Sequence, residues 1–245
     1  MERTDDLLRP GLAELARGLS GLEGLELLRA AWNGPLRGRI ALVSSFGVES
    51  AVLLDMVASV DRRFPVLFLD TGWHFPETLR YRDELVARLG LEDVRTLVPD
   101  PAALARHDPD RQLCRRDPDL CCHLRKTEPL DAALEGFLAW VTGRKRYQGG
   151  LRASLPTVEV EGGTGRLKLN PLAGWSAEDI RHYRRLRQLP PHPLTLRGFA
   201  SVGCLPCTTT TAPGEPPRAG RWRGLDKTEC GIHLPRLRAS SSPSG

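Results

Sequence analysis

Short apolar runs alternate with stretches of helical periodicity along most of the chain. The runs are four to six residues long and lie at 39–44, 65–69, 93–98 and 139–142. The intervening stretches repeat apolar residues at the spacing of an amphipathic helix, at 48–60, 76–89 and 125–138. Strands that alternate with helices predict an α/β fold, with a mainly parallel, twisted sheet and helices on both of its faces.

Three further patterns extend this expectation. Residues 7–32 place Leu and Ala at helical spacing, interrupted by glycines, and predict one or two short N-terminal helices. The runs 157–160 and 166–169 flank a glycine-rich turn and predict a β-hairpin. Ser176 and Asp179 have the spacing of a capping box, which predicts a helix that begins there.

After residue 190 the chain becomes rich in Pro, Gly, Thr and Arg and loses its periodicity. We therefore expect an N-terminal helical segment, an α/β core, an irregular C-terminal segment and a disordered tail, with limits at 1–36, 37–190, 191–239 and 240–245. A chain of 245 residues can bury one substantial core. No charge-poor apolar stretch reaches the roughly 18 residues of a membrane span. We expect a cytoplasmic protein without membrane association.

The formal net charge of +5 suits either a nucleic-acid partner or a small polyanion. The basic residues form several short groups, with few aromatic residues among them. A platform for single-stranded nucleic acid needs such aromatic residues. The pattern therefore favours a small anionic ligand and argues against nucleic acid.

Six cysteines without an export signal favour metal or redox chemistry over a disulfide framework. Cys121 and Cys122 are adjacent, and Cys204 and Cys207 form a Cys-x-x-Cys pair. Four thiolates in two pairs suit zinc or an iron–sulfur cluster. Adjacent cysteines favour the cluster, because zinc knuckles usually separate paired ligands by two or more residues. Cys114 lies in no motif and is interpreted as structural.

Cys230 lies outside both pairs, with Lys227 and His233 close in sequence. A free thiol has a pKa of about 8.5, so cations that raise its thiolate fraction would make it a nucleophile. The spacing alone leaves two interpretations open, a nucleophile or a spare surface cysteine.

Two loops follow predicted strands at the edge where open α/β sheets bind ligands. The first, 45–50, leads from a strand into a helix, and its backbone amides could hold an anion. It lacks the Gly-Lys-Ser/Thr of the usual nucleotide-binding loop. The second contains Asp70 and Gly72, and Asp70 could equally be a turn or capping residue.

Together these residues resemble the adenylyl sulfate and phosphoadenylyl sulfate reductase family, which is related to the ATP pyrophosphatase (PP-loop) enzymes. The resemblance extends from about residue 39 to 234 and rests on several motifs in the right order. These are Ser-Phe-Gly-Val-Glu-Ser at 45–50, Asp-Thr-Gly at 70–72, Phe-Pro-Glu-Thr at 75–78, Cys-Cys-x-x-Arg-Lys at 121–126, Trp-Val-Thr-Gly at 140–143, Asn-Pro-Leu at 170–172, Gly-Cys-Leu-Pro-Cys-Thr at 203–208, Arg-Ala-Gly-Arg-Trp at 218–222 and Glu-Cys-Gly-Ile-His at 229–233.

The paired cysteines resemble those of the iron–sulfur branch of this family, which reduces adenylyl sulfate in sulfate assimilation and cysteine biosynthesis. The resemblance implies one four-iron four-sulfur cluster, with Cys121, Cys122, Cys204 and Cys207 as its ligands. It implies adenylyl sulfate as substrate and thioredoxin, or a glutaredoxin-like protein, as electron donor. Phosphoadenylyl sulfate, or both nucleotides, is the alternative substrate. A homo-oligomer is left open.

The resemblance also implies a role for individual residues. Cys230 is the expected catalytic nucleophile, which would form an S-sulfocysteine and expel AMP. The expected substrate-binding residues are Ser45, Phe46, Gly47, Glu49, Ser50, Leu69, Asp70, Gly72, Lys126, Arg146, Arg218, Arg221 and His233. Of these, Lys126, Arg218 and Arg221 would offset the charge of the sulfate, and Leu69, Asp70 and Gly72 would approach the adenosine.

One motif departs from the family pattern. Where the family commonly has Gly-x-Arg-Arg-Asp-Gln, this chain has Lys145 in place of an Arg and Tyr147 in place of the Asp. Two other hypotheses remain, an RNA-thiolating PP-loop enzyme and a zinc-stabilised nucleotide-binding module. Phe46 argues against the first, because the ATP-binding loop of those enzymes usually has a Gly at that position.

Overall fold

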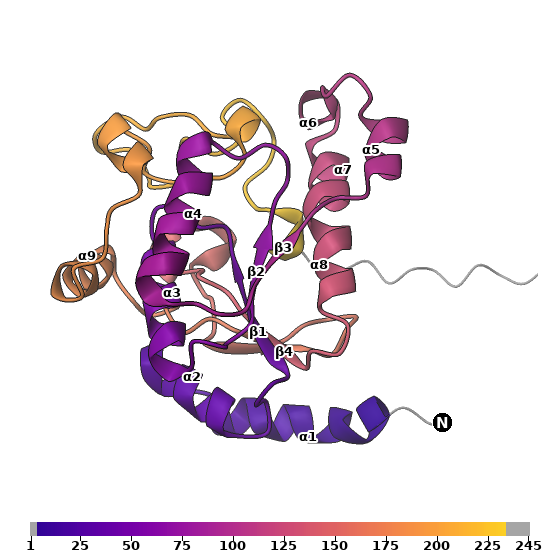
Figure 1. The fold of residues 1–245 in the computed structure, drawn as a ribbon, viewed down its shortest axis with the longest axis vertical. Helices are drawn as coiled ribbons and strands as arrows, with labels where there is room; N and C mark the ends of the chain where they lie inside the picture. Colours follow the sequence, from indigo (N-terminus) through magenta and orange to yellow (C-terminus); the bar gives the residue numbers. More distant parts are fainter. Residues whose placement is uncertain (1–3, 234–245) are drawn as a thin grey trace, which may run out of the picture.

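A six-stranded sheet forms the centre of the computed structural model, which describes residues 4–233 (Figure 1). The strands lie in the order β3-β2-β1-β4-β6-β5. All neighbouring strands are parallel except β5 and β6, which form the antiparallel hairpin that the sequence predicts. Their bounds are β1 Ile40–Ser44, β2 Val66–Leu69, β3 Val94–Leu97, β4 Ala139–Val141, β5 Val158–Val160 and β6 Leu167–Leu169. The predicted strands and the α/β class are confirmed.

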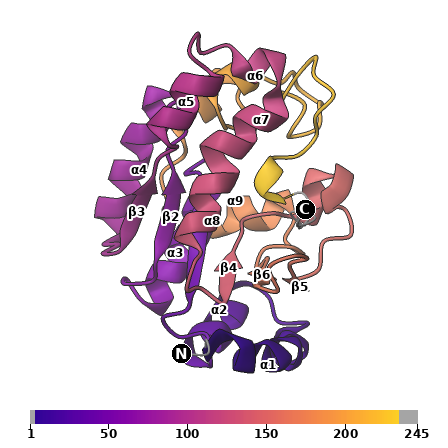
Figure 2. The same ribbon diagram turned by 90° about the vertical axis from the view of Figure 1, so that its right-hand side faces the viewer.

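Helices cover both faces of the sheet, as the sequence predicts (Figures 1 and 2). One face carries α2 Gly24–Asn33, α3 Ser50–Val60 and α4 Pro76–Leu89, and α9 Ala177–Leu186 packs on α3. The other face carries α5 Pro101–His107, α6 Leu113–Arg116, α7 Pro118–Cys122 and α8 Glu128–Ala133. The N-terminal helix α1 Thr4–Leu19 lies below the sheet in Figure 1. Strands covered on both faces are expected to be apolar, and every residue of the apolar strand β2 is buried.

The capping box at Ser176 is confirmed. The Ser176 hydroxyl accepts a hydrogen bond from the Asp179 amide, and the Asp179 carboxylate accepts one from the Ser176 amide, at the start of α9. Between α9 and residue 233, the end of the described chain, there are three short 3₁₀ turns at Pro193–Arg197, Leu205–Cys207 and Gly231–His233. The predicted tail at 240–245 lies outside the described residues.

The predicted helix at 125–138 is only partly correct. Residues His123–Thr127 form a π-helical turn between α7 and α8, in which the Glu128 amide donates to the His123 carbonyl. Pro129 gives the reason, because it has no amide hydrogen and its ring would clash with the Arg125 carbonyl in an α-helix. The wider turn removes that clash. Such turns are frequent at functional sites.

A buried ion pair fixes this π-helical turn. The Arg125 guanidinium donates to the Asp108 carboxylate at 2.7 Å and to the Thr71 carbonyl, just after β2, at 2.8 Å. Asp108 in turn accepts from the Leu113 amide at the start of α6. The side chains of Arg125 and Asp108 are 6% and 0% exposed. Three segments that are distant in sequence are thereby joined.

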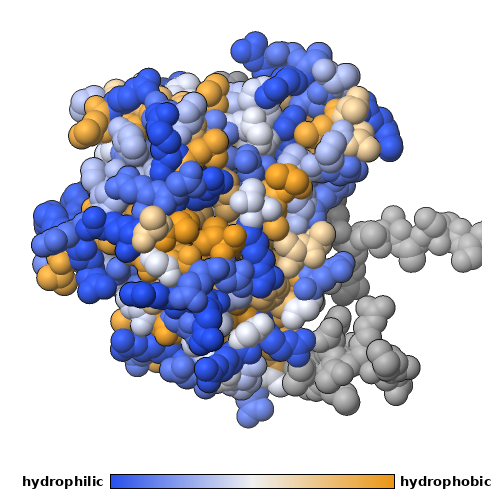
Figure 3. Space-filling model, viewed as in Figure 1, coloured by the Kyte–Doolittle hydropathy of each residue, from blue (hydrophilic) through white to orange (hydrophobic). Residues whose placement is uncertain are grey.

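The molecular surface is mixed. Figure 3 shows hydrophilic side chains over most of one face and hydrophobic ones mainly near its centre. Across residues 4–233, no helix combines the length and apolar character needed to cross a bilayer.

The Asp108–Arg125 pair leads to a stability prediction. Asp108→Asn leaves the Arg125 charge buried without a counterion, so we expect the free energy of unfolding to fall by about 3–5 kcal/mol. Urea denaturation measures it. The control is Asp110→Asn in the same loop, where the partner Arg116 is half exposed and little change is expected. Equal effects of the two substitutions would contradict the prediction.

Candidate active site

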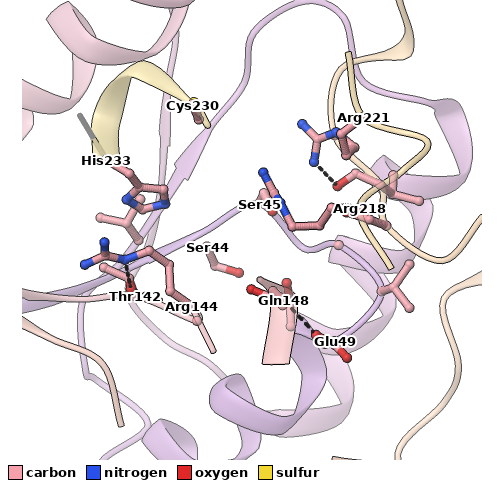
Figure 4. Close-up of a pocket in the computed structure, with 18 of the residues that line it drawn as sticks. Ser44, Ser45, Glu49, Thr142, Arg144, Gln148, Arg218, Arg221, Cys230 and His233 are labelled. Carbon is pink, nitrogen blue, oxygen red and sulfur yellow. Dashed lines mark hydrogen bonds between the residues drawn. The ribbon is translucent and has the colours of Figure 1, made fainter. Parts of the chain in front are cut away.

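A cavity of about 200 Å³ opens at the carboxyl edge of the sheet (Figure 4). Its walls come from the loops after β1, β2 and β4, from Lys126 in the π-helical turn, and from residues 200–233. The carboxyl ends of parallel strands share one edge, which is why these loops meet. Figure 4 shows side chains from the loop after β1, the segment after β4 and the C-terminal segment around this cavity.

The loop after β1 lines the cavity with Ser45, Gly47, Glu49 and Ser50. Phe46 lies between them, but its side chain is fully buried and packs edge-on against Phe68. Its φ of +47° is a left-handed conformation, which costs a non-glycine residue about 1–2 kcal/mol. Burial of the ring offsets that strain, and the Phe46 amide donates to the Ser44 hydroxyl at 3.2 Å.

Glu49 is held by the loop that follows β4. Its carboxylate accepts from Lys145 at 2.9 Å, from Gln148 at 3.1 Å, and from the hydroxyl of Tyr147. Burial raises the pKa of Glu49, but Lys145 and these hydrogen bonds outweigh burial and keep the pKa below its usual value. Lys145 and Tyr147, the two departures from the family pattern, thus bind the same carboxylate.

Cys230 lies on the C-terminal segment, 9% exposed. Lys126 and Arg221 line the same cavity. The neighbouring Cys122 thiol, and then the charges of Lys126 and Arg221, hold the pKa of Cys230 well below that of an ordinary thiol in spite of burial. Its backbone amide donates to Glu229 at 2.9 Å. A thiolate is therefore favoured here.

Lys126 faces this thiol. Burial lowers the pKa of Lys126, but negative charge on Cys204 and Cys230 outweighs burial and raises it, so the ammonium group stays charged. Arg218 and Arg221 bracket the Trp222 ring, with guanidinium carbons 5.4 and 4.6 Å from its centroid. The cavity thus has a cationic wall beside a nucleophilic sulfur.

Arg152 and Glu229 form a second buried ion pair at this wall. Arg152 donates to the two carboxylate oxygens of Glu229 at 2.6 and 2.7 Å. Burial raises the pKa of Glu229, but Arg152 and then Arg218 keep it below its usual value. Because Glu229 precedes Cys230, this bidentate pair holds the segment that carries Cys230 against the core.

The last turn, Gly231–His233, packs on β4 and β6. The ring of His233 stacks on Trp140 with an interplanar angle of 3°. Lys168 of β6 lies over the same indole and donates to the Ile232 carbonyl at 3.4 Å. Burial and the Lys168 charge hold the pKa of His233 well below its usual range, so its imidazole is neutral.

The structure brings together most of the residues that the sequence points to. The cavity contains Cys230 and the predicted contacts Ser45, Gly47, Glu49, Ser50, Leu69, Lys126, Arg218, Arg221 and His233. Four predicted contacts do not line it. These are Phe46, whose ring is in the core, Asp70, which accepts from the Gly72 amide, Gly72 itself, and Arg146, which is exposed and donates to the Leu155 carbonyl.

Sequence reasoning missed several residues of the cavity, namely Thr71, His74, Thr142, Arg144, Gln148, Arg152 and Glu229. Thr71 and Glu229 lay within motifs already identified, next to residues that received a role. Arg152 lies outside every identified motif. It follows a Gly-Gly pair in a region without periodicity, so the sequence did not mark it as a site residue.

A second, smaller cavity adjoins the first and is lined by Cys121, Cys122, Cys204 and Cys207. Cys204 and Lys126 line both cavities. Burial and neighbouring thiols raise the pKa of Cys121 to about 12 and that of Cys207 to about 11. Thiols in such a group become thiolates when they bind a metal. Within the described part of the chain, no three Cys, His, Asp or Glu side chains are grouped tightly enough for a single metal ion.

Comparison with known proteins agrees with this site. Residues 39–210 match the family model of the phosphoadenosine phosphosulfate reductase domain. The adenosine 5'-phosphosulfate reductase of Mesorhizobium japonicum is 49% identical, covering 94% of this chain and 91% of that protein. The protein of the same name from Mycolicibacterium smegmatis is 40% identical, covering 94% of each chain. The phosphoadenosine 5'-phosphosulfate reductase of Gloeobacter violaceus is 44% identical, covering 80% and 82%.

Solved structures share the fold. The phosphate complex of phosphoadenylyl-sulfate reductase from Candida auris has a TM-score of 0.64 and 26% identity, and covers 86% of this chain and 98% of that one. Yeast FAD synthetase has a TM-score of 0.51 at 17% identity, with 80% and 73% covered, and shows similarity of fold alone.

Lys168 gives a pH prediction. Burial, then Arg144, lowers its pKa from 10.5 to about 8. Between these values the unfolded chain holds a proton that the folded chain has released, so the free energy of unfolding rises with pH, by about 3 kcal/mol at most. Below pH 8 Lys168 is protonated in both the folded and the unfolded chain. Its contribution to the free energy of unfolding then no longer changes with pH, and the stabilisation gained at higher pH is absent.

We expect Lys168→Met to remove this rise, measured by urea denaturation between pH 7.5 and 10.5. Arg181→Met, at an exposed arginine of α9, is the control and should keep the rise. A rise of the same size in Lys168→Met would show that another group causes it.

Proposed function

Because the chain belongs to the phosphoadenosine phosphosulfate reductase family, we propose that it reduces adenylyl sulfate to sulfite and AMP through an S-sulfo intermediate on Cys230. The observation that carries this proposal is the position of the Cys230 thiol, beside Lys126 and Arg221 in a cavity at the carboxyl edge of the sheet. Sulfate assimilation and cysteine synthesis are the corresponding metabolic roles. The cytoplasm is the corresponding compartment.

Adenylyl sulfate is favoured over its 3'-phosphorylated form by the two cysteine pairs, which resemble the iron–sulfur branch of the family. The relatives from Mesorhizobium japonicum and Mycolicibacterium smegmatis carry the name of the same activity. The Gloeobacter violaceus relative is named for the phosphorylated substrate, so dual specificity is the alternative.

In the first step the Cys230 thiolate attacks the sulfate sulfur. An S–S bond forms, the S–O bond to the phosphate breaks, and AMP leaves with the electron pair. Nucleophile, sulfate and leaving group are all negative, so cations have to offset their repulsion. Lys126, Arg218 and Arg221 provide them at the cavity wall. The loop amides at 45–50 and the N-terminus of α3 are suited to the phosphate.

In the second step a dithiol protein such as thioredoxin attacks the Cys230 sulfur. Sulfite leaves with the electrons of the S–S bond, and the second thiol of the donor resolves the mixed disulfide. The donor loses two electrons, and the sulfate sulfur gains two. Cys230 is 9% exposed, so the C-terminal segment has to move before a protein thiol can reach it.

The donor set of the small cavity fits a four-iron four-sulfur cluster. Cys121, Cys122, Cys204 and Cys207 surround it, so each could hold one iron. The cluster would supply a structural and electrostatic centre beside the reaction. Lys126 borders both cavities and would share its charge between the cluster thiolates and Cys230. The Thr71 hydroxyl, 3.4 Å from the Cys204 sulfur, would support that ligand.

Cys230→Ser tests the nucleophile. Serine keeps the shape but not the thiolate, so sulfite formation with thioredoxin should fall to background, while iron content and nucleotide binding stay unchanged. Anaerobic purification, iron analysis and a sulfite assay with adenylyl sulfate and its 3'-phosphorylated form measure this. Sulfite at the normal rate would refute the assignment.

Proteolysis tests the movement of the C-terminal segment. We expect bound AMP or adenylyl sulfate to slow cleavage after Pro213, because nucleotide adds contacts to Arg218, Arg221 and the Cys230 turn. Mass spectrometry locates the cuts, and cleavage in the loop before α6 gives an internal control. Unchanged cleavage after Pro213 at saturating nucleotide would contradict the prediction.

A further inference from the structure

A fifth cysteine borders the small cavity. Cys114, on α6, lines it together with the four paired cysteines. It is 5% exposed, and among residues 4–233 no side chain or backbone group forms a hydrogen bond with its sulfur. From the sequence this residue is interpreted as structural, since it lies in no motif.

Cys114 lies beside the helix that carries Cys121. Its helix α6 packs against α7, and Cys114, Cys121 and Cys207 line the same small cavity. Cys122 instead lies against Gly231, the residue after Cys230. Cys114 thus shares the cavity with Cys121 and Cys207, whereas Cys122 packs against the segment that carries the proposed nucleophile.

The position of Cys114 is fixed by the surrounding backbone. The Leu113 amide donates to Asp108 at 2.8 Å, and Asp108 is held by the buried Arg125. The Asp117 amide donates to the Leu113 carbonyl, and the Asp117 side chain then caps α7, which carries Cys121. Helix α6 and the ligand helix α7 are therefore anchored to one another.

We propose that Cys114 is a reserve ligand, which binds the iron left open when the thiolate of Cys121 or Cys207 is absent. The proposal rests on the cluster proposed above. The Cys114 thiol gives its proton to solvent and its sulfur binds iron. One thiolate replaces another, so no electron is transferred and the charge of the site is unchanged. A buried cysteine that only fills space would behave like a small apolar residue and need no sulfur.

The test compares variants purified without oxygen, with iron and acid-labile sulfide per chain and the visible spectrum as readouts. Cys114→Ala should match the unaltered protein. Cys121→Ser should keep most of its iron, and Cys121→Ser with Cys114→Ala should hold at least about tenfold less. Cys122→Ser, on the other side, should lose iron whether residue 114 is Cys or Ala.

Equal iron in Cys121→Ser and in the double variant would overturn the proposal. Cys207→Ser, with and without Cys114→Ala, repeats the comparison if the first pair does not fold by circular dichroism. Loss of iron in both Cys121→Ser and Cys207→Ser, whether residue 114 is Cys or Ala, would also overturn the proposal. Absence of iron and sulfide from the unaltered protein would instead refute the proposed cluster, which separates the two failures.

Discussion

The buried Arg125 guanidinium donates at once to Asp108 and to the Thr71 carbonyl, and both cavities depend on this arrangement. It holds the π-helical turn against the carboxyl end of β2. Cys121 and Cys122 precede that turn, and Lys126 lies within it. Replacing such a pair by apolar residues can be neutral for stability, so its value here is the fixed geometry it imposes.

The large cavity balances opposite charges at close range. Cations of Lys126, Arg218 and Arg221 surround a sulfur that acts as an anion, and Glu229 offsets the charge of Arg152. An anionic ligand that enters has to be attracted without being trapped, and the nucleophile has to stay deprotonated. Glu229 serves the first need by offsetting the charge of Arg152, and by accepting from the Cys230 amide it fixes the backbone at that residue.

The altered motif after β4 binds the loop at 45–50. Lys145 and Tyr147 both bind Glu49, so a lysine and a phenol fix the carboxylate of the loop at 45–50. Phe46 in the same loop takes a backbone conformation usual for glycine and compensates by burying its ring. Phe46 and Tyr147 lie behind the cavity wall, whereas Lys145 is part of it.

The sequence by itself determined the elements and the family. Apolar periodicity located the strands, the hairpin and the capped helix, because the buried face of a strand or helix repeats at a fixed spacing. The order of the motifs identified the family, while the roles of the cysteines stay predictions. Only the tertiary structure decided which distant residues meet. Arg152 and Glu229 are 77 positions apart, and Cys114 and Cys207 line one cavity although no motif relates them. Such pairings depend on how non-periodic loops pack over the edge of the sheet. The local spacing of residues does not predict contacts between distant loops.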